Sequence, residues 1–102
     1  MNPDLQQLTL VFPDELEGAV LDALGAIAPE QPYTLLHATG HGRDFAHASS
    51  RERVRGQVGR RALWLVAPAA SIEPLLAALR EHIHSCDLVW WTLPVHAIGD
   101  FS

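Results

Sequence analysis

The sequence from Tyr33 to Ala67 reads YTLLHATGHGRDFAHASSRERVRGQVGRRALWLVA. Its two ends, residues 33–39 and 61–67, are rich in apolar and β-branched residues and predict two strands. The connection between them is too long for a hairpin turn, and long connections in compact domains are often functional. Six of the seven arginines lie between Arg43 and Arg61, and the chain contains no lysine. We therefore expect the functional region in this arginine-rich connection.

The charge of the chain is unevenly distributed. The formal net charge is −5, yet the stretch from Arg43 to Arg61 holds six arginines and two acids, whereas the rest holds one arginine and ten acids. A nucleic-acid-binding domain needs a broad basic face, which an acidic body does not provide. A single basic connection suits a small anion such as a phosphate or nucleotide, or an acidic patch on a partner protein.

Length and composition predict one globular domain over residues 1–102, with a long loop at about residues 40–59. Of the 102 residues, 48% are hydrophobic and 19% are charged, as in compact domains. No apolar run is long enough to span a membrane, and the N-terminus lacks the pattern of a signal peptide. The one cysteine, Cys86, cannot form an internal disulfide. We expect a cytoplasmic protein without direct membrane insertion.

The first part of the chain predicts a strand and a helix. Apolar residues alternate with others over residues 5–12, which is the period of a half-buried strand. Asp14 and Glu17 have the spacing of a capping box, and Pro29 and Pro32 end the helix. The apolar positions of the helix recur at steps of three and four, at Leu16, Ala19, Val20, Ala23, Leu24 and Ile27.

The last third predicts a second helix and a fourth strand. Ser71 is the expected N-cap residue, and Pro74 is acceptable in the first turn, where amide groups lack helical partners. The buried stripe of this helix consists of Ile72, Leu75, Leu76, Leu79 and Ile83. Residues 88–95 predict a strand at a sheet edge, because Pro94 cannot donate a ladder hydrogen bond.

The order strand, helix, strand, strand, helix, strand is that of the α+β ferredoxin-like fold. In this fold two helices cover one face of a four-stranded antiparallel sheet. The other face would be open and would carry tryptophan and leucine side chains. Because a large exposed apolar face usually marks an interface, we expect a homo-oligomer.

This arrangement resembles the PII signalling superfamily. The resemblance rests on Gly-His-Gly-Arg at 40–43, Arg-Gly-Gln-Val-Gly-Arg at 55–60 and the strand exit at 8–13. It implies a homotrimer whose sheets face inward, a long T-loop that reaches a partner, and ATP or ADP binding in clefts between subunits. The chain departs from the nucleotide-binding members after its second helix, because residues 84–87 contain no Gly/Lys-rich phosphate loop.

More narrowly, the chain is similar to PII-like proteins that accompany heavy-metal efflux pumps, on the basis of residues 35–43 and 51–56. This resemblance implies a regulatory role linked to metal tolerance, with a membrane transporter as partner. The CutA proteins form a related family for which the same fold and trimeric state are implied.

Glycines and arginines at both ends of the long connection are the candidate ligand-binding residues. Arginine offers paired donors to phosphate or carboxylate, and glycine lets backbone amides approach an anion. The candidates for a nucleotide or another anion are Gly40, Gly42, Arg43, Arg55, Gly56, Gln57, Gly59 and Arg60. The alternative is that the glycines are hinges and the arginines only keep a loop solvated.

Histidine and cysteine side chains are the candidate ligands for a divalent or copper ion, because imidazole and thiolate bind zinc and copper. The candidates are His41, His47, His84 and Cys86. His37 and His41 share a strand face, but four residues of strand separate them by roughly 13 Å, too far for one ion. The alternative is that each histidine is a surface or packing residue.

The sequence contains no nucleophile motif, Walker loop or clear acid pair, so we expect a protein that binds and does not catalyse. Three functions stay open. The first is a regulator that senses a nucleotide or related anion, and the second is a heavy-metal sensor or chaperone. The third is a structural trimer whose loop only docks a partner.

Overall fold

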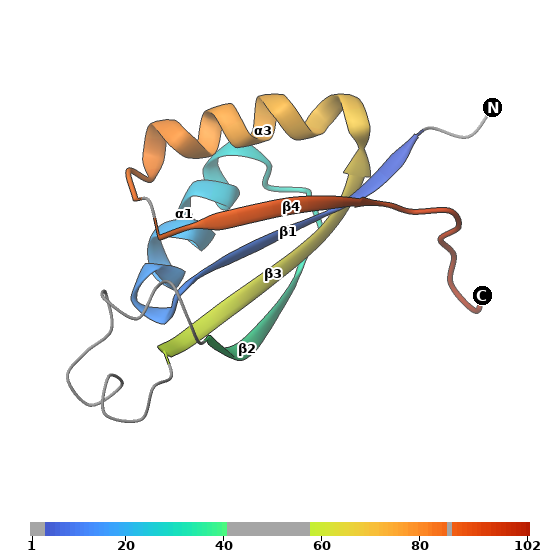
Figure 1. Cartoon of the computed structure of the whole chain (residues 1–102). Helices are drawn as coiled ribbons and strands as arrows, with labels where there is room; N and C mark the ends of the chain where they lie inside the picture. The colour runs from blue at the N-terminus through green and yellow to red at the C-terminus, as the bar shows by residue number, and fades with distance from the viewer. Residues whose placement is uncertain (1–3, 41–57, 86) are drawn as a thin grey trace.

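Four strands and two helices make up the part of the chain that this computed structural model describes, residues 4–40, 58–85 and 87–102. The elements are β1 (Leu5–Pro13), the 3-10 turn η1 (Asp14–Leu16), α1 (Glu17–Ile27), β2 (Thr34–Gly40), β3 (Val58–Pro68), α3 (Ala69–His82) and β4 (Val89–Pro94). The strands are antiparallel, in the order β2-β3-β1-β4. Both helices lie on one face of the sheet (Figure 1). The predicted α+β ferredoxin-like architecture is confirmed.

The core lies between the helices and the inner face of the sheet. Leu8, Leu10 and Phe12 alternate along β1 and are fully buried, as the two-residue period predicts. The other core residues are Val20, Ala23 and Leu24 of α1, Leu63, Leu65 and Ala67 of β3, and Ile72, Leu75, Leu76 and Leu79 of α3. Each large apolar side chain buried in this way contributes about 1.5–3 kcal/mol.

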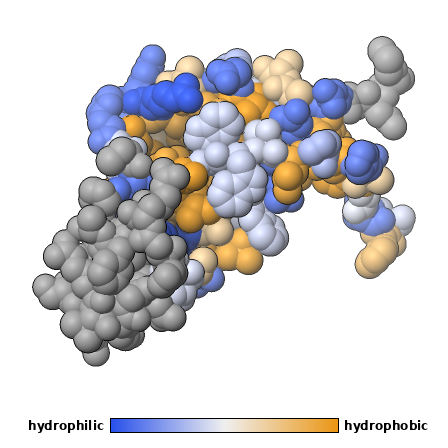
Figure 2. All heavy atoms as spheres, in the orientation of Figure 1, coloured by the Kyte–Doolittle hydropathy of each residue, from blue (hydrophilic) through white to orange (hydrophobic). Residues whose placement is uncertain are grey.

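The opposite face of the sheet, called the open face below, carries a row of tryptophan and threonine side chains. Thr9 of β1 is paired in register with Trp64 of β3 and with Trp91 of β4. The two indoles are 42% and 45% exposed, whereas Thr9 between them is only 3% exposed. Figure 2, in the orientation of Figure 1, shows that apolar and polar side chains alternate over the visible surface. The tryptophan side chains expected on the open face are therefore exposed there, next to polar side chains.

Two predicted helix starts differ from the structure. The capping box of Asp14 and Glu17 does not form, because Asp14 begins η1 and the Glu17 carboxylate accepts a hydrogen bond from Arg61. Ser71 is not an N-cap residue, because α3 begins at Ala69, directly after β3. The Ala69 N–H donates to the carbonyl oxygen of Asp4 at 2.7 Å. This contact with Asp4, the residue before β1, accompanies a helix start that is earlier than the local sequence predicts.

The two strands predicted between Tyr33 and Ala67 have other bounds in the structure, and β3 is longer than predicted. β2 reaches Gly40, and β3 begins at Val58, three residues before the predicted start. The register pairs Gly40 with Val58 and Thr39 with Gly59, so the ladder continues through both glycines. β3 is an interior strand. β4 ends at Pro94 and lies at a sheet edge, and this edge position was predicted. Within the described ranges, neither helix is long and apolar enough to cross a membrane.

Candidate functional site

The candidate site lies where β2 ends and β3 begins, and it consists of Gly40, Gly59 and Arg60; we call it the strand-end site. Arg60 is 4% exposed, and its neighbours in register are Ala38 on β2 and Pro13 on β1. A Cβ atom placed on Gly40 would lie 2.7 Å from Nε of Arg60 and 3.0 Å from its Cγ. Only glycine at position 40 leaves room for the Arg60 side chain to lie along the end of β2 in this way.

Arg60 and Arg61 lie on opposite faces of the sheet. Arg61 lies on the helix face, where its Nε donates to Glu17 Oε1 at 2.6 Å and its Nη1 donates to the Arg60 carbonyl oxygen at 3.2 Å. Arg60 lies on the open face, in the alternate position. One arginine therefore joins the sheet to α1, and the other lies at the strand-end site.

The structure brings together three of the predicted anion-binding residues: Gly40, Gly59 and Arg60. The other five, Gly42, Arg43, Arg55, Gly56 and Gln57, lie outside the described residues. Both glycines belong to the β2–β3 ladder and not to a loop.

Of the predicted metal ligands, the structure describes only His84, which is exposed after the end of α3. His41, His47 and Cys86 lie outside the described residues. Within residues 4–40, 58–85 and 87–102 no three His, Cys, Asp or Glu side chains are grouped as a metal site would require. The metal site therefore stays a prediction.

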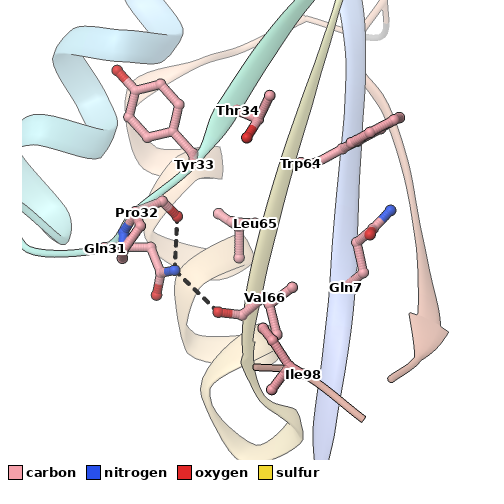
Figure 3. Close-up of a pocket in the computed structure, with 9 residues that line it drawn as sticks. All are labelled: Gln7, Gln31, Pro32, Tyr33, Thr34, Trp64, Leu65, Val66 and Ile98. Atoms are coloured by element: carbon pink, nitrogen blue, oxygen red, sulfur yellow. Dashed lines mark hydrogen bonds between the residues drawn. The ribbon is translucent and has the colours of Figure 1, made fainter. Parts of the chain in front are cut away.

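A second feature, missed by sequence reasoning, is a hollow of about 330 Å³ beside the open face (Figure 3). Its walls include Trp64 and Val66 of β3, Gln7 of β1 and Ile98 of the C-terminal segment. Gln31 donates from Nε2 to the Val66 carbonyl oxygen at 3.1 Å, which joins the segment before β2 to β3. The one sequence signal for this hollow is the tryptophan expected on the open face of the sheet.

The chemistry of this hollow differs from that of the strand-end site. Its lining residues are Gln7, Gln31, Pro32, Tyr33, Thr34, Trp64, Leu65, Val66 and Ile98. None of these side chains carries a charge at neutral pH, so amide and hydroxyl groups supply its polar contacts. It is suited to neutral groups, whereas the strand-end site offers a guanidinium to an anion.

Four antiparallel strands with two helices on one face define the class of this fold as α+β ferredoxin-like. A family model described as a protein of unknown function, DUF3240, matches residues 3–102. The chain belongs to the DUF3240 family. No protein with curated annotation matches the sequence significantly.

Solved structures show the same fold. A DUF3240 family protein from Shewanella baltica OS155 is 20% identical, with a TM-score of 0.76 and all of both chains covered. CPII, a nitrogen regulatory PII-like protein from Thiomonas intermedia K12 bound to ADP, AMP and bicarbonate, is 14% identical, with a TM-score of 0.67 and coverage of 95% of this chain and 96% of CPII. A functionally unknown protein from Pediococcus pentosaceus ATCC 25745 is 13% identical, with a TM-score of 0.70 and coverage of 98% and 100%.

Proposed function

We propose that this chain is a cytoplasmic, non-catalytic PII-like regulatory protein that binds a small anion at the strand-end site and thereby alters a partner. The observation that carries the proposal is the placement of the Arg60 side chain against Gly40 at the end of β2. A guanidinium held in place loses little freedom on binding and can donate two parallel hydrogen bonds to a phosphate or carboxylate. The adjoining segment 41–57 carries four more arginines, which suit the same ligand class.

The acting form in this proposal is a homotrimer whose open faces meet, with ligand clefts between subunits. Trp64 and Trp91 supply exposed aromatic surface for such a contact. The described strand residues of the open face include no acid, so copies with a net charge of −5 can approach there without repulsion between carboxylates. The proposed partner is a membrane transporter, in line with the resemblance to proteins that accompany heavy-metal efflux pumps.

Isothermal titration calorimetry with ADP, AMP and bicarbonate tests this function, because these are the molecules bound to CPII. We expect at least one of them to bind, and we expect Arg60→Ala to weaken that binding by about tenfold or more, the usual cost of losing charge-assisted hydrogen bonds. Arg60→Lys keeps the charge but loses the paired donors, so its affinity should fall between the two.

Arg80→Ala is the matched control, because it removes an arginine from α3 instead of from the strand-end site. Its nucleotide affinity should equal that of the wild type. Circular dichroism of each variant verifies that the fold is retained. Absence of heat with all three ligands at millimolar concentration, or equal losses in Arg60→Ala and Arg80→Ala, would refute the proposal.

A further inference from the structure

A small apolar pocket lies between the last turns of α3 and the start of β4, and we call it the α3–β4 pocket. It has a volume of about 120 Å³. Leu76 and Leu79 of α3 form its buried part, and Ile83 and Leu88 add half-buried apolar surface. An apolar cavity of about 150 Å³ in a protein can hold benzene, so this somewhat smaller pocket is close to the size of a single aromatic ring.

The rim of the α3–β4 pocket combines an aromatic and a cationic side chain. Trp90, on the helix face of edge strand β4, is 39% exposed. Arg80 is exposed and makes no ion pair with any part of the chain that the structure describes. Figure 2 shows hydrophilic side chains over this end of α3 with apolar side chains next to them. The rim therefore suits an apolar group that carries a carboxylate beside it.

The C-terminal segment of the chain has this chemistry. Among the described residues, the last backbone hydrogen bond between this segment and the sheet runs from the Val95 N–H to the Leu5 carbonyl oxygen at 3.0 Å. Phe101 is fully exposed, at 110% of the reference area. The neighbouring Asp100 carboxylate accepts hydrogen bonds from the hydroxyl and the backbone N–H of Ser102, and these lower its pKa. At neutral pH an exposed ring thus stands next to a carboxylate anion.

We propose that Phe101 of one copy of the chain inserts into the α3–β4 pocket of a second copy, where Asp100 pairs with Arg80. Burial of the phenyl ring and of the Trp90 face supplies the apolar contact. The ion pair selects the orientation of the tail. The last turn of α3 presents carbonyl oxygens, which repel an anion, so the carboxylate stays at the rim and only the ring enters.

The geometry favours a second copy over the tail of the same copy. The pocket lies at the start of β4 and the tail leaves from its end, and the residues from Trp90 to Pro94 span roughly 13 Å of strand. In Figure 1 the tail continues away from the body at this far end. Among the described arginines, Arg61 is paired with Glu17 and Arg60 lies on the open face, whereas Arg80 lines this pocket. Arg80 is thus the arginine placed to pair with an acidic tail at the pocket.

This contact goes beyond the proposed function, because it needs neither nucleotide nor the open face. A tail-to-pocket contact is heterologous: each copy gives its tail to one neighbour and takes the tail of another, which is compatible with a closed ring.

A synthetic peptide with the sequence of residues 97–102, AIGDFS, tests the contact in solution. The receptor is the full chain with Phe101→Ala, so that its own tail cannot compete. The readout is the indole N–H signal of Trp90 in ¹H–¹⁵N NMR spectra, identified with Trp90→Phe. We expect saturable movement of this signal with the peptide in the millimolar range, and none with a peptide that carries Phe101→Ala.

The charge pair has its own variants. Asp100→Asn in the peptide and Arg80→Ala in the receptor should each weaken binding about three- to fivefold, as expected for an exposed ion pair. Applied together, they should weaken it no further than either alone. Three results would overturn the proposal: no movement of the Trp90 signal, movement of the Trp64 signal instead, or an affinity indifferent to both charge variants. Nucleotide binding is measured in a separate calorimetry experiment. The proposed anion binding and the proposed tail contact can therefore fail independently.

Discussion

Nε of Arg61 lies 2.6 Å from Oε1 of Glu17, and this pair joins β3 to the first turn of α1. The two residues are 44 positions apart in the sequence. The side chains are 19% and 36% exposed, so the pair is partly shielded from water. Arg61 is thus held on the helix face, whereas Arg60 lies on the open face at the strand-end site.

The Glu17–Arg61 pair should contribute modestly to stability. We expect Glu17→Gln to lower the free energy of unfolding by about 0.5–1 kcal/mol, the range for ion pairs that stay partly hydrated. Urea unfolding of Glu17→Gln, Arg61→Gln and the double variant measures the coupling between them. The exposed Glu15→Gln serves as control. A coupling energy of zero would show that the pair is only a geometric contact.

Glycine at position 40 should be required for the placement of Arg60. Gly40→Ala puts a methyl group 2.7 Å from Arg60 Nε, so the side chain must move, and we expect a loss of about 1–3 kcal/mol in unfolding free energy. It should also weaken anion binding in calorimetry. Gly25→Ala on α1 meets no atom within 4 Å and should stabilise the protein by about 0.5–1 kcal/mol. Similar effects of both substitutions would contradict the proposed contact.

Substitution of two phenylalanines by alanine should have very different effects on the free energy of unfolding. Phe12 is fully buried in the core, so Phe12→Ala should lower the unfolding free energy by about 3–5 kcal/mol. Phe101 is fully exposed in the single chain, so Phe101→Ala should change it by less than about 0.5 kcal/mol. Denaturant titration at low protein concentration, where association does not contribute, makes this comparison.

The open face should determine the oligomeric state. We expect native mass spectrometry of the wild type to show a trimer and Trp91→Glu to shift it toward the monomer, because a carboxylate buried in an apolar contact is costly. Ala77→Glu adds the same charge to an exposed position of α3 and should leave the trimer intact. A wild-type monomer would refute the assembly part of the proposed function.

The pKa of Asp100 should lie below its ordinary value of 3.8, chiefly because the Ser102 hydroxyl donates to the carboxylate. Ser102→Ala removes this donor, so the pKa should rise, although the backbone N–H of residue 102 remains. A lowered pKa means that the tail contact is present at neutral pH and is lost as the pH falls through the folded-state value. The carboxyl carbon shift of Asp100 in a ¹³C NMR pH titration measures this. A pKa unchanged by Ser102→Ala would contradict the assigned cause.

Local patterns predicted the strands well and the helix starts poorly. The alternation of Leu8, Leu10 and Phe12 identified the buried face of β1, and it did so because each side chain of a strand points opposite to the next. The prediction of an N-cap at Ser71 was wrong, because α3 begins at Ala69, where the end of β3 meets the start of β1. Capping signals are weak local preferences, and a tertiary hydrogen bond readily overrides them.

By itself, the sequence determined the order of the elements, the faces of the strands and the concentration of arginine next to β2 and β3. These follow from periods of two and 3.6 residues and from composition, which short stretches carry on their own. Only the tertiary structure decided that Gly40 leaves room for Arg60, that Glu17 meets Arg61, and that Trp90 closes a pocket with Leu76. Strand register and helix packing bring these distant residues together, and no local pattern encodes either.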